Sequence, residues 1–354
     1  MLVLGDNRPR LYAGMLAAGA LGGYAMPAFP DATLDEIRHF VHEAGARFAL
    51  AEDQEQVDKI LDLREQGATI EHIIYDDPRG LAAYANPGLI SWDTLQAKGA
   101  ELVIRNPNPR NELIARAQPE GPAVFVHSSG STGKPKGVVL SHRNLLAGVR
   151  NAYRGGAFQF GESILAYLPM AWVGDFAVTM GAGIALHFTI NIPERQETVL
   201  QNLREIAPTF YLAAPRSWDN LLTTIQVRME DSSWLKRLVY KFFMAVAISA
   251  EKRKLEGGQP TLKQWLLSPI GEWLVYGPIK DQFGLTRLRG AFTGGEAMGE
   301  DTFVFYRALG IKLRQLYGQT ETSAYNAIQD LNEVRLHTVG RPLPGVDIRI
   351  SDAG

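Results

Sequence analysis

Residues 128–137, SSGSTGKPKG, combine residue types that together can bind an anion. The three glycines let the backbone turn freely and approach a ligand closely. Successive N–H groups in such a loop can form a concave nest, while the hydroxyl groups and two lysines add donors and positive charge. The stretch follows a predicted strand at residues 123–126 and precedes a helix that begins at His142 with Ser141 as its N-cap. These features predict a polyphosphate-binding loop whose glycines are Gly130, Gly133 and Gly137.

The spacing of residues 128–137 does not match three other glycine-containing motifs. A Walker loop needs a glycine, four residues and then Gly-Lys-Ser/Thr, but Gly130 is followed at that distance by PKG at residues 135–137. The glycines also lack the spacing of a dinucleotide-binding fingerprint, and neither Ser129 nor Ser131 lies in the Gly-x-Ser-x-Gly frame of a hydrolase. A plain glycine-serine linker would not need the Lys-Pro-Lys-Gly continuation.

Residues 128–137 resemble the phosphate loop of the adenylate-forming (AMP-binding) superfamily, which includes acyl-CoA synthetases, peptide adenylation domains and luciferases. YGQTE at 317–321 is similar to the second hallmark of that family, Tyr-Gly-x-Thr-Glu. TGGE at 293–296 resembles the glycine pair that closes over adenine, and VGRPLPG at 339–345 resembles the segment that follows. The motifs agree with the family in order and rough spacing, and the resemblance covers essentially the whole chain.

The resemblance implies a role for each matching residue. Thr320 would bond the α-phosphate of ATP, Glu321 would bind Mg²⁺, and Lys136 would complete the catalytic set. The phosphate-binding residues would be Ser128, Ser129, Gly130, Ser131, Thr132, Gly133 and Lys134. The adenine and AMP pocket would be formed by Gly294, Gly295, Glu296, Gln315, Tyr317 and Gly318.

The resemblance also implies a reaction and its co-substrates. The family activates a carboxylate with ATP and Mg²⁺, releases pyrophosphate, and transfers the acyl group to a thiol, here that of CoA. Trp172, Val173 and Gly174 occupy the place of the acyl-pocket wall. Residues 233–254 resemble the insertion of long-chain fatty acyl-CoA synthetases, so a long-chain fatty acid is the expected substrate. A ligase for another acid and a non-catalytic binding module of the same fold remain alternatives.

Asp175 is the one acidic residue near this wall that could serve the ammonium group of an amino-acid substrate. A solvated position, or a place at a helix N-terminus, is the preferred interpretation for this carboxylate. Arg287 and Arg289 are interpreted as solvated residues at the end of a strand rather than as ligands.

Strand-like apolar runs alternate with helical patterns along the 354 residues, which predicts an α/β protein of layered parallel sheets. Thr33 begins one such helix with a capping box that extends to Glu36. Predicted strands lie at 48–51, 73–75, 123–126, 164–167, 209–212 and 288–292, and helices lie near 198–206 and 300–309. Approximate sub-domains are 1–120 and 121–354, with a surface connection at 106–110. By resemblance this is the N-terminal large domain of an adenylate-forming enzyme, shortened at both ends, without the C-terminal lid domain.

The composition narrows the partners and the compartment. A net charge of -2 argues against a nucleic-acid binder, and the absence of cysteine removes disulfides, thiolate metal sites and a cysteine nucleophile. With no recognisable signal peptide, we expect a cytoplasmic protein. Residues 176–192 are predicted to form a buried helix that leads into a buried strand rather than a membrane span.

Residues 233–254 form a strong helical pattern with an apolar stripe and flanking basic residues. The first interpretation is a surface helix whose stripe packs on the core. The second is a basic amphipathic helix that makes peripheral contact with a membrane surface.

Overall fold

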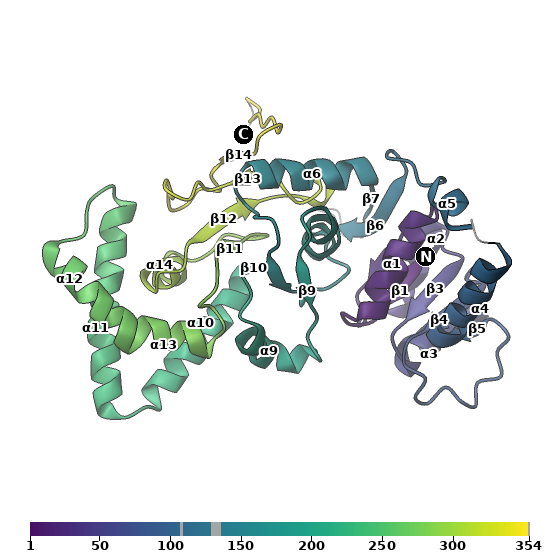
Figure 1. Ribbon diagram of the computed structural model, residues 1–354, viewed down its shortest axis with the longest axis horizontal. Helices are drawn as coiled ribbons and strands as arrows, with labels where there is room; N and C mark the ends of the chain where they lie inside the picture. The colour runs from purple at the N-terminus through teal and green to yellow at the C-terminus, as the bar shows by residue number, and fades with distance from the viewer. Residues whose placement is uncertain (107–108, 129–135, 353–354) are drawn as a thin grey trace. The chain divides into compact units, whose positions relative to one another are not determined.

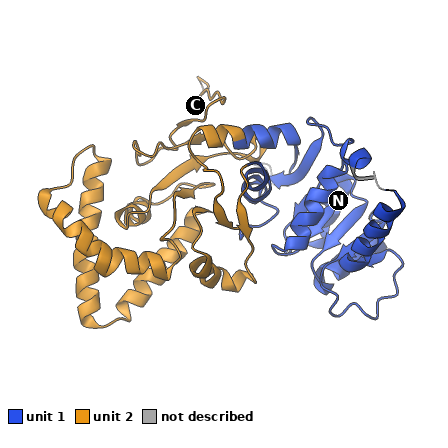
Figure 2. Cartoon of the chain, viewed as in Figure 1, with its two compact units in different colours: residues 1–149, 166–185 blue, residues 150–165, 186–354 orange. Residues whose placement is uncertain are grey.

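The computed structural model describes residues 1–106, 109–128 and 136–352. It divides into two compact units, shown in Figure 2: Met1–Val149 with Ala166–Ala185, and Arg150–Leu165 with Leu186–Gly354. The predicted sub-domain boundary between residues 120 and 121 falls inside the first unit. Residue 124 lies on a strand that bridges to Ala25 of the same unit, so the chain on both sides of that boundary packs together.

The first unit is built on a five-stranded parallel sheet with the order β2-β1-β3-β4-β5 (Figure 1). Helices α2 (Leu34–Ala44) and α3 (Gln54–Glu65) share an apolar core with alternate strand residues such as Ala49 and Ala51. Leu50 points to the opposite face, where it contacts Gly14 of α1 (Pro9–Ala20). The strands are β1 (Leu2–Leu4), β2 (Met26–Ala28), β3 (Phe48–Ala51), β4 (His72–Tyr75) and β5 (Leu89–Ser91).

Two further segments complete the described part of this unit. Helices α4 (Trp92–Arg105) and α5 (Pro109–Ile114) follow the sheet. Strands β6 (Pro122–Ser128) and β7 (Lys136–Ser141) then pair antiparallel and lead into α6 (His142–Arg154). The short helix α7 (Val173–Asp175), the π-helix η1 (Phe176–Ala182) and α8 (Gly183–Ala185) return to the unit later in the chain.

The second unit contains a sheet with the order β10-β11-β12-β13-β14. Strands β10 (Phe210–Ala213), β11 (Gly290–Thr293) and β12 (Leu313–Tyr317) are parallel, whereas β13 (Ala327–Ile328) and β14 (Arg341–Pro342) are antiparallel. A separate parallel pair joins β8 (Ser163–Leu165) to β9 (Thr189–Asn191). The helices and helical turns are η2 (Gln196–Thr198), α9 (Val199–Ile206), α10 (Pro215–Glu230), α11 (Trp234–Leu255), α12 (Leu262–Gly271), η3 (Glu272–Tyr276), α13 (Gly277–Gln282), α14 (Glu300–Ala308) and η4 (Thr320–Thr322).

An aromatic cluster fixes the helices of the second unit against its sheet. Trp218 of α10 is fully buried, and its Nε1 donates to the carbonyl oxygen of Phe292 on β11 at 3.2 Å. The hydroxyl of Tyr306 on α14 donates to the carbonyl oxygen of Trp218 at 2.7 Å. The rings of Trp218 and Tyr306 pack edge to face at 4.6 Å. This cluster holds β11 in place, and β11 carries part of the candidate site.

Most local predictions are confirmed. Thr33 caps α2 in a reciprocal box with Glu36, and Ser141 Oγ accepts from the Asn144 N–H at 3.1 Å. The predicted strands appear as β3, β4, β6, β8, β10 and β11, with ends shifted by up to two residues and β8 shortened at its C-terminal end to Leu165. The helices expected near residues 198–206 and 300–309 appear as α9 and α14.

The predicted parallel sheets are present, and β6–β7 and β12–β13–β14 add antiparallel pairs that the sequence did not indicate. Two other predictions need correction. Residues 176–185 are largely buried and helical as expected, but strand β9 is exposed rather than buried. The apolar stripe of α11 does not pack on the core, since Trp234 and Leu238 are 70% and 59% exposed. No helix among the described residues has the length and apolar character needed to cross a bilayer.

Candidate functional site

The described residues that flank the predicted phosphate loop belong to an antiparallel strand pair in the first unit. Ser128 at the end of β6 is in register with Lys136 at the start of β7. The other predicted phosphate-binding residues, which are Ser129, Gly130, Ser131, Thr132, Gly133 and Lys134, fall outside the described residues. The expected order of strand, loop and helix is therefore wrong: a second strand intervenes before α6, and it positions Lys136.

Gly137 has a packing role rather than the predicted turn role. It lies within β7, and a Cβ at this position would sit 2.3 Å from Cζ of Phe125 on the paired strand. The ring of Phe125 therefore fills the space that a side chain would need. The absence of a side chain at Gly137 therefore lets β6 and β7 pair closely.

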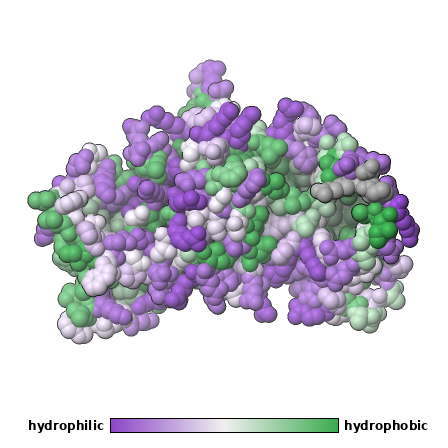
Figure 3. Space-filling view, viewed as in Figure 1, coloured by the Kyte–Doolittle hydropathy of each residue, from purple (hydrophilic) through white to green (hydrophobic). Residues whose placement is uncertain are grey.

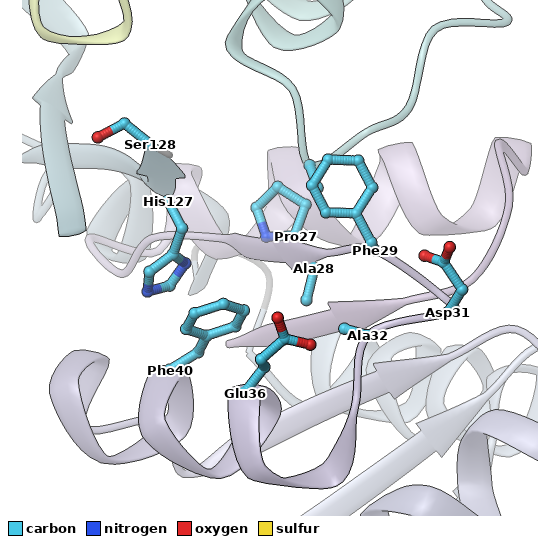
Figure 4. Close-up of a pocket in the computed structure, with 10 residues that line it drawn as sticks. Pro27, Ala28, Phe29, Asp31, Ala32, Glu36, Phe40, His127 and Ser128 are labelled. Carbon is cyan, nitrogen blue, oxygen red and sulfur yellow. The ribbon is translucent and has the colours of Figure 1, made fainter. Parts of the chain in front are cut away.

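A pocket of about 400 Å³ opens beside the start of this stretch (Figure 4). His127 and Ser128 at the end of β6 form one wall, and Glu36 and Phe40 of α2 form another. Ala171, which immediately precedes the predicted acyl-wall residue Trp172, also lines the pocket. Within this unit the pocket thus brings the first phosphate-loop residue close to the segment predicted to contact the acyl group.

His127 is a polar residue of this pocket that the sequence analysis did not select. Its side chain is 8% exposed and its ring stacks on Phe40 with 3.5 Å between ring centroids. Burial lowers the pKa of His127, although Glu43, whose Oε2 lies 3.5 Å from Nε2, acts in the opposite direction. At neutral pH the ring is therefore neutral and can accept or donate one hydrogen bond. The sequence could have indicated His127, because it directly precedes Ser128, the first residue of the predicted phosphate loop.

The predicted acyl-wall residues lie together at the start of α7. Trp172 is the N-cap and half-buried, and Val173 and Gly174 are buried behind it. A Cβ on Gly174 would lie 2.7–2.9 Å from three carbons of the Trp172 ring. The indole therefore rests directly on the backbone of Gly174, which fixes the ring orientation.

Asp175 is buried and bonded within the protein, so the solvated interpretation is wrong. It is 1% exposed; its Oδ2 accepts from the Tyr12 hydroxyl at 2.8 Å, and its Oδ1 accepts from Thr179 Oγ1 at 2.9 Å. Burial raises the pKa of Asp175 to about 7, although the two hydrogen bonds act to lower it. Asn7 extends the network by donating to Tyr12 at 2.6 Å and to the Leu168 carbonyl at 2.9 Å. The network ties α1 to the segment that carries Trp172.

The predicted adenine-binding residues lie in the second unit, at the carboxyl ends of two adjacent parallel strands. Thr293 of β11 is in register with Gln315 of β12. Ligands of open α/β sheets bind beyond such strand ends. Five of the predicted residues end or follow these strands, and Gln315, the sixth, lies two residues before the end of β12: Gly294, Gly295, Glu296, Gln315, Tyr317 and Gly318. The geometry brings them to one edge of the sheet.

A tight turn follows Tyr317. A Cβ on Gly318 would lie 1.7 Å from the carbonyl oxygen of Ala324, so only glycine fits there. The Asn326 N–H donates to the Tyr317 carbonyl at 3.0 Å, which closes the turn. Ser323 and Ala324 have φ of 59° and 72°, a left-handed conformation that is costly for residues with a side chain. The turn stores strain next to two of the three predicted catalytic residues, Thr320 and Glu321.

Thr320 and Glu321 start η4 within this turn, with Glu321 exposed and Thr320 partly exposed. A carboxylate oxygen is a suitable Mg²⁺ ligand, and Mg²⁺ commonly takes one or two carboxylates together with substrate phosphates. Among the described residues there is no group of three or more His, Asp or Glu that could hold a metal by itself. The exposed carboxylate of Glu321 therefore fits a metal that arrives with a nucleotide.

Arg289 is exposed and directly precedes β11, as predicted, and it also forms an ion pair that the sequence did not indicate. Its Nη2 lies 2.8 Å from Oε2 of Glu162, whose side chain is 1% exposed. Thr209 Oγ1 also donates to Glu162. Arg289 therefore neutralises a buried carboxylate of the second unit and has a structural role.

The comparisons with known proteins agree with these motifs. A family model described as AMP-binding enzyme matches residues 1–354. The chain is 25% identical over 359 residues to the long-chain-fatty-acid–CoA ligase ACSBG2 of Xenopus laevis, which covers 98% of this chain and 47% of that protein. It is 26% identical over 340 residues to the long-chain-fatty-acid–CoA ligase FadD15 of Mycobacterium bovis, which covers 95% of this chain and 54% of that protein. The chain spans about half the length of these curated relatives.

The fold matches a solved domain of the same architecture. The inhibitor-bound N-terminal domain of FACL13 from Mycobacterium tuberculosis superimposes with a TM-score of 0.59 at 16% identity, covering 97% of this chain and 68% of that one. The predicted α/β fold of an adenylate-forming N-terminal domain is confirmed.

Proposed function

Because the chain belongs to the AMP-binding enzyme family, we propose that the protein it forms activates a long-chain fatty acid with ATP and transfers it to CoA. The observation that carries this proposal is the set of predicted nucleotide residues at the carboxyl ends of β11 and β12. Gly294 and Gly295 follow β11 there, and Tyr317 at the end of β12 offers a ring that a flat base could contact. Thr320 and Glu321 follow within three to four residues of that ring.

In the proposed first step a carboxylate oxygen of the fatty acid attacks the α-phosphorus of ATP. The bond to the bridging oxygen breaks, and pyrophosphate leaves with its electron pair. Lys136 and Ser128 would bind the phosphates, Thr320 would donate to the α-phosphate, and Glu321 would hold Mg²⁺. When bound, Mg²⁺ would neutralise charge that builds on the phosphate oxygens. In the second step the CoA thiol gives its proton to solvent and its sulfur attacks the acyl carbon. The bond from that carbon to the phosphate oxygen breaks, and AMP leaves with the electron pair.

Two observations favour a fatty acid over an amino acid. Both carboxylate oxygens of Asp175 are engaged by Tyr12 and Thr179 inside the protein, so this carboxylate does not face a substrate ammonium group. The curated relatives reported above are named for long-chain fatty acids. We assign the acyl-wall role to Trp172, Val173 and Gly174 within this proposal.

The test is pyrophosphate release with a chain-length series of acetate, octanoate, palmitate and benzoate. The series is run on this chain and on any longer native protein that contains it. We expect release that needs ATP, Mg²⁺ and acid, with palmitate the best substrate, and loss of release in Glu321→Gln. ATP binding without release from either protein would identify a binding module instead, and equal rates with acetate and palmitate would refute the long-chain assignment.

A further inference from the structure

Helix α11 turns an apolar face outward. Its buried side is formed by Phe243, Met244 and Glu251. The residues four apart at 234, 238 and 242 lie on the opposite side of the helix. This outward side carries four large apolar side chains with exposed fractions of 48–70%: Trp234, Leu235, Leu238 and Phe242. A helix that only covers a core would show the reverse pattern.

Helix α12 and the π-helical segment η3 continue this apolar surface. Gln264 Nε2 donates to Ser249 Oγ at 3.2 Å, and Ser249 lies on the same side of α11 as Phe242, so α12 packs on the outward side of α11. Five side chains of this segment are 47–78% exposed at three- and four-residue spacing: Leu262, Trp265, Leu266, Ile270 and Trp273. Figure 3 shows hydrophobic atoms at the end of the second unit formed by α11 and α12. We name the nine exposed side chains the α11–η3 patch.

The composition of this segment indicates what covers the patch. Three of the six tryptophans of the chain lie in it and are 67–78% exposed, while the other three are half-buried or buried. Residues 234–276 carry seven Lys or Arg against three Asp or Glu, although the whole chain is nearly balanced at 36 and 38. One of those three acids, Glu251, is 5% exposed and paired with Arg307 at 2.6 Å. Outward tryptophan with surrounding lysine and arginine is the composition of helices that lie in a lipid interface.

We propose that the α11–η3 patch docks on the surface of an anionic phospholipid bilayer. The tryptophan and leucine side chains enter the boundary between headgroups and acyl chains, and Arg253 and Lys263 remain at the level of the lipid phosphates. Both side chains are exposed: Arg253 lies three turns after Phe242 on the outward side of α11, and Lys263 is next in sequence to Leu262 of α12. The proposal concerns only the second unit and requires neither ATP nor substrate, so it stands or falls separately from the catalytic proposal.

The test is flotation of the full 354-residue chain with vesicles, without nucleotide or fatty acid. One preparation contains phosphatidylcholine and phosphatidylglycerol at a ratio of about 3:1, and the other contains phosphatidylcholine alone. We expect flotation with the first preparation, weaker flotation with the second, and a blue shift of tryptophan fluorescence on binding. The variant L238Q/W265Q/W273Q removes three patch side chains that are 59–78% exposed, and its partitioning is expected to fall at least tenfold.

The matched control is F160Q/I350Q, which replaces two apolar side chains of the same unit that are 59% and 80% exposed but lie outside the patch. It should float like the wild type. Trp265→Gln alone serves if the triple variant fails to fold, and it should weaken binding at least threefold. Absence of wild-type flotation, or a patch variant that floats like the control, would overturn the proposal. The proposal would also be overturned if the wild type forms a dimer in solution and the patch variant is a monomer, because a second copy of the chain would then cover the patch. Equal flotation with the two preparations would overturn the anionic requirement.

Discussion

Ser128 and Lys136 lie opposite each other on the antiparallel strands β6 and β7. The ladder fixes the backbone on both sides of the glycine-rich stretch, while the Lys136 side chain is exposed. A residue with this placement can bind a phosphate without contributing to the core. Its removal should therefore separate ligand binding from folding.

We expect Lys136→Ala to weaken ATP binding at least tenfold, because a charge-assisted hydrogen bond to a phosphate contributes about 1.5–3 kcal/mol. The thermal unfolding midpoint should not change. Titration calorimetry with ATP and Mg²⁺ measures the first quantity, and circular dichroism measures the second. Lys98→Ala, at an exposed position of α4, is the control and should bind ATP like the wild type. Unchanged affinity in Lys136→Ala would remove this residue from the site.

Gly318→Ala should destabilise the turn after β12, because the added Cβ would lie 1.7 Å from a backbone oxygen that cannot move without opening the turn. We expect a loss of about 2 kcal/mol or more in unfolding free energy and a loss of ATP binding that is larger than the stability change explains. Denaturant titration and calorimetry measure the two effects. Gly299→Ala is the control: no atom lies within 4 Å of the added Cβ, and its cost should stay below about 1 kcal/mol. Equal effects at the two glycines would contradict the turn geometry.

Asp175 should make stability depend on pH in a defined direction. Its pKa in the folded protein is raised from 3.8 to about 7, so between these values the native state holds a proton that the unfolded chain has released. The unfolding free energy should therefore fall as pH rises through this window, by up to about 1.4 kcal/mol per pH unit, and level off above it. Denaturant titrations at pH 5, 6, 7 and 8 measure the slope.

Asp175→Asn should lack this fall, because the amide carries no titrating proton. The relevant quantity is the difference between variant and wild type, since the lowered pKa of His127 acts in the opposite sense: its contribution to stability is lost as pH falls. Asp31→Asn changes an exposed carboxylate of the same unit and should retain the wild-type slope. Parallel slopes in Asp175→Asn and wild type would show that Asp175 is ionised throughout.

Local signals in the sequence predicted local structure well. The Thr33 capping box and the Ser141 cap need only residues three positions apart, so the helices start where the sequence places them. The chemistry of the two nucleotide motifs is also local: TGGE and YGQTE end or follow adjacent strands as expected. Burial that depends on distant partners was not predictable. Asp175 reads as a solvated acid in sequence, yet its partner Tyr12 lies 163 residues away.

The same limit explains why strand β7 and the outward face of α11 were not predicted. The expected helix after the phosphate loop is preceded by β7, whose pairing with β6 depends on Phe125 packing over Gly137. The apolar stripe of α11 has the period of a core-facing helix, and periodicity alone does not say which side of the helix meets the core. That side is chosen by Phe243 and Met244, which are buried.

The contact between Trp172 and Gly174 provides a final prediction. Gly174→Ala would place a methyl group 2.7 Å from the indole ring in a buried segment, and such overpacking costs about 1–3 kcal/mol. Trp172→Ala alone removes the ring, and in the double variant the added methyl group has space. We therefore expect a double-mutant cycle in unfolding free energy in which the cost of Gly174→Ala falls by at least about 1 kcal/mol when Trp172 is absent. Additive costs would mean that the ring does not rest on Gly174.

The same two variants test the acyl-wall role. If Trp172 contacts the acyl chain, its displacement in Gly174→Ala and its removal in Trp172→Ala should both change the ratio of pyrophosphate release with octanoate to that with palmitate. ATP affinity should stay within about twofold of wild type, because the nucleotide motifs TGGE and YGQTE lie outside this segment. Ile184→Ala is the control, because this exposed side chain lies ten residues further along the same unit. If the double-mutant cycle shows coupling but the octanoate-to-palmitate ratio does not change, the packing contact is supported and Trp172 is not part of the acyl wall.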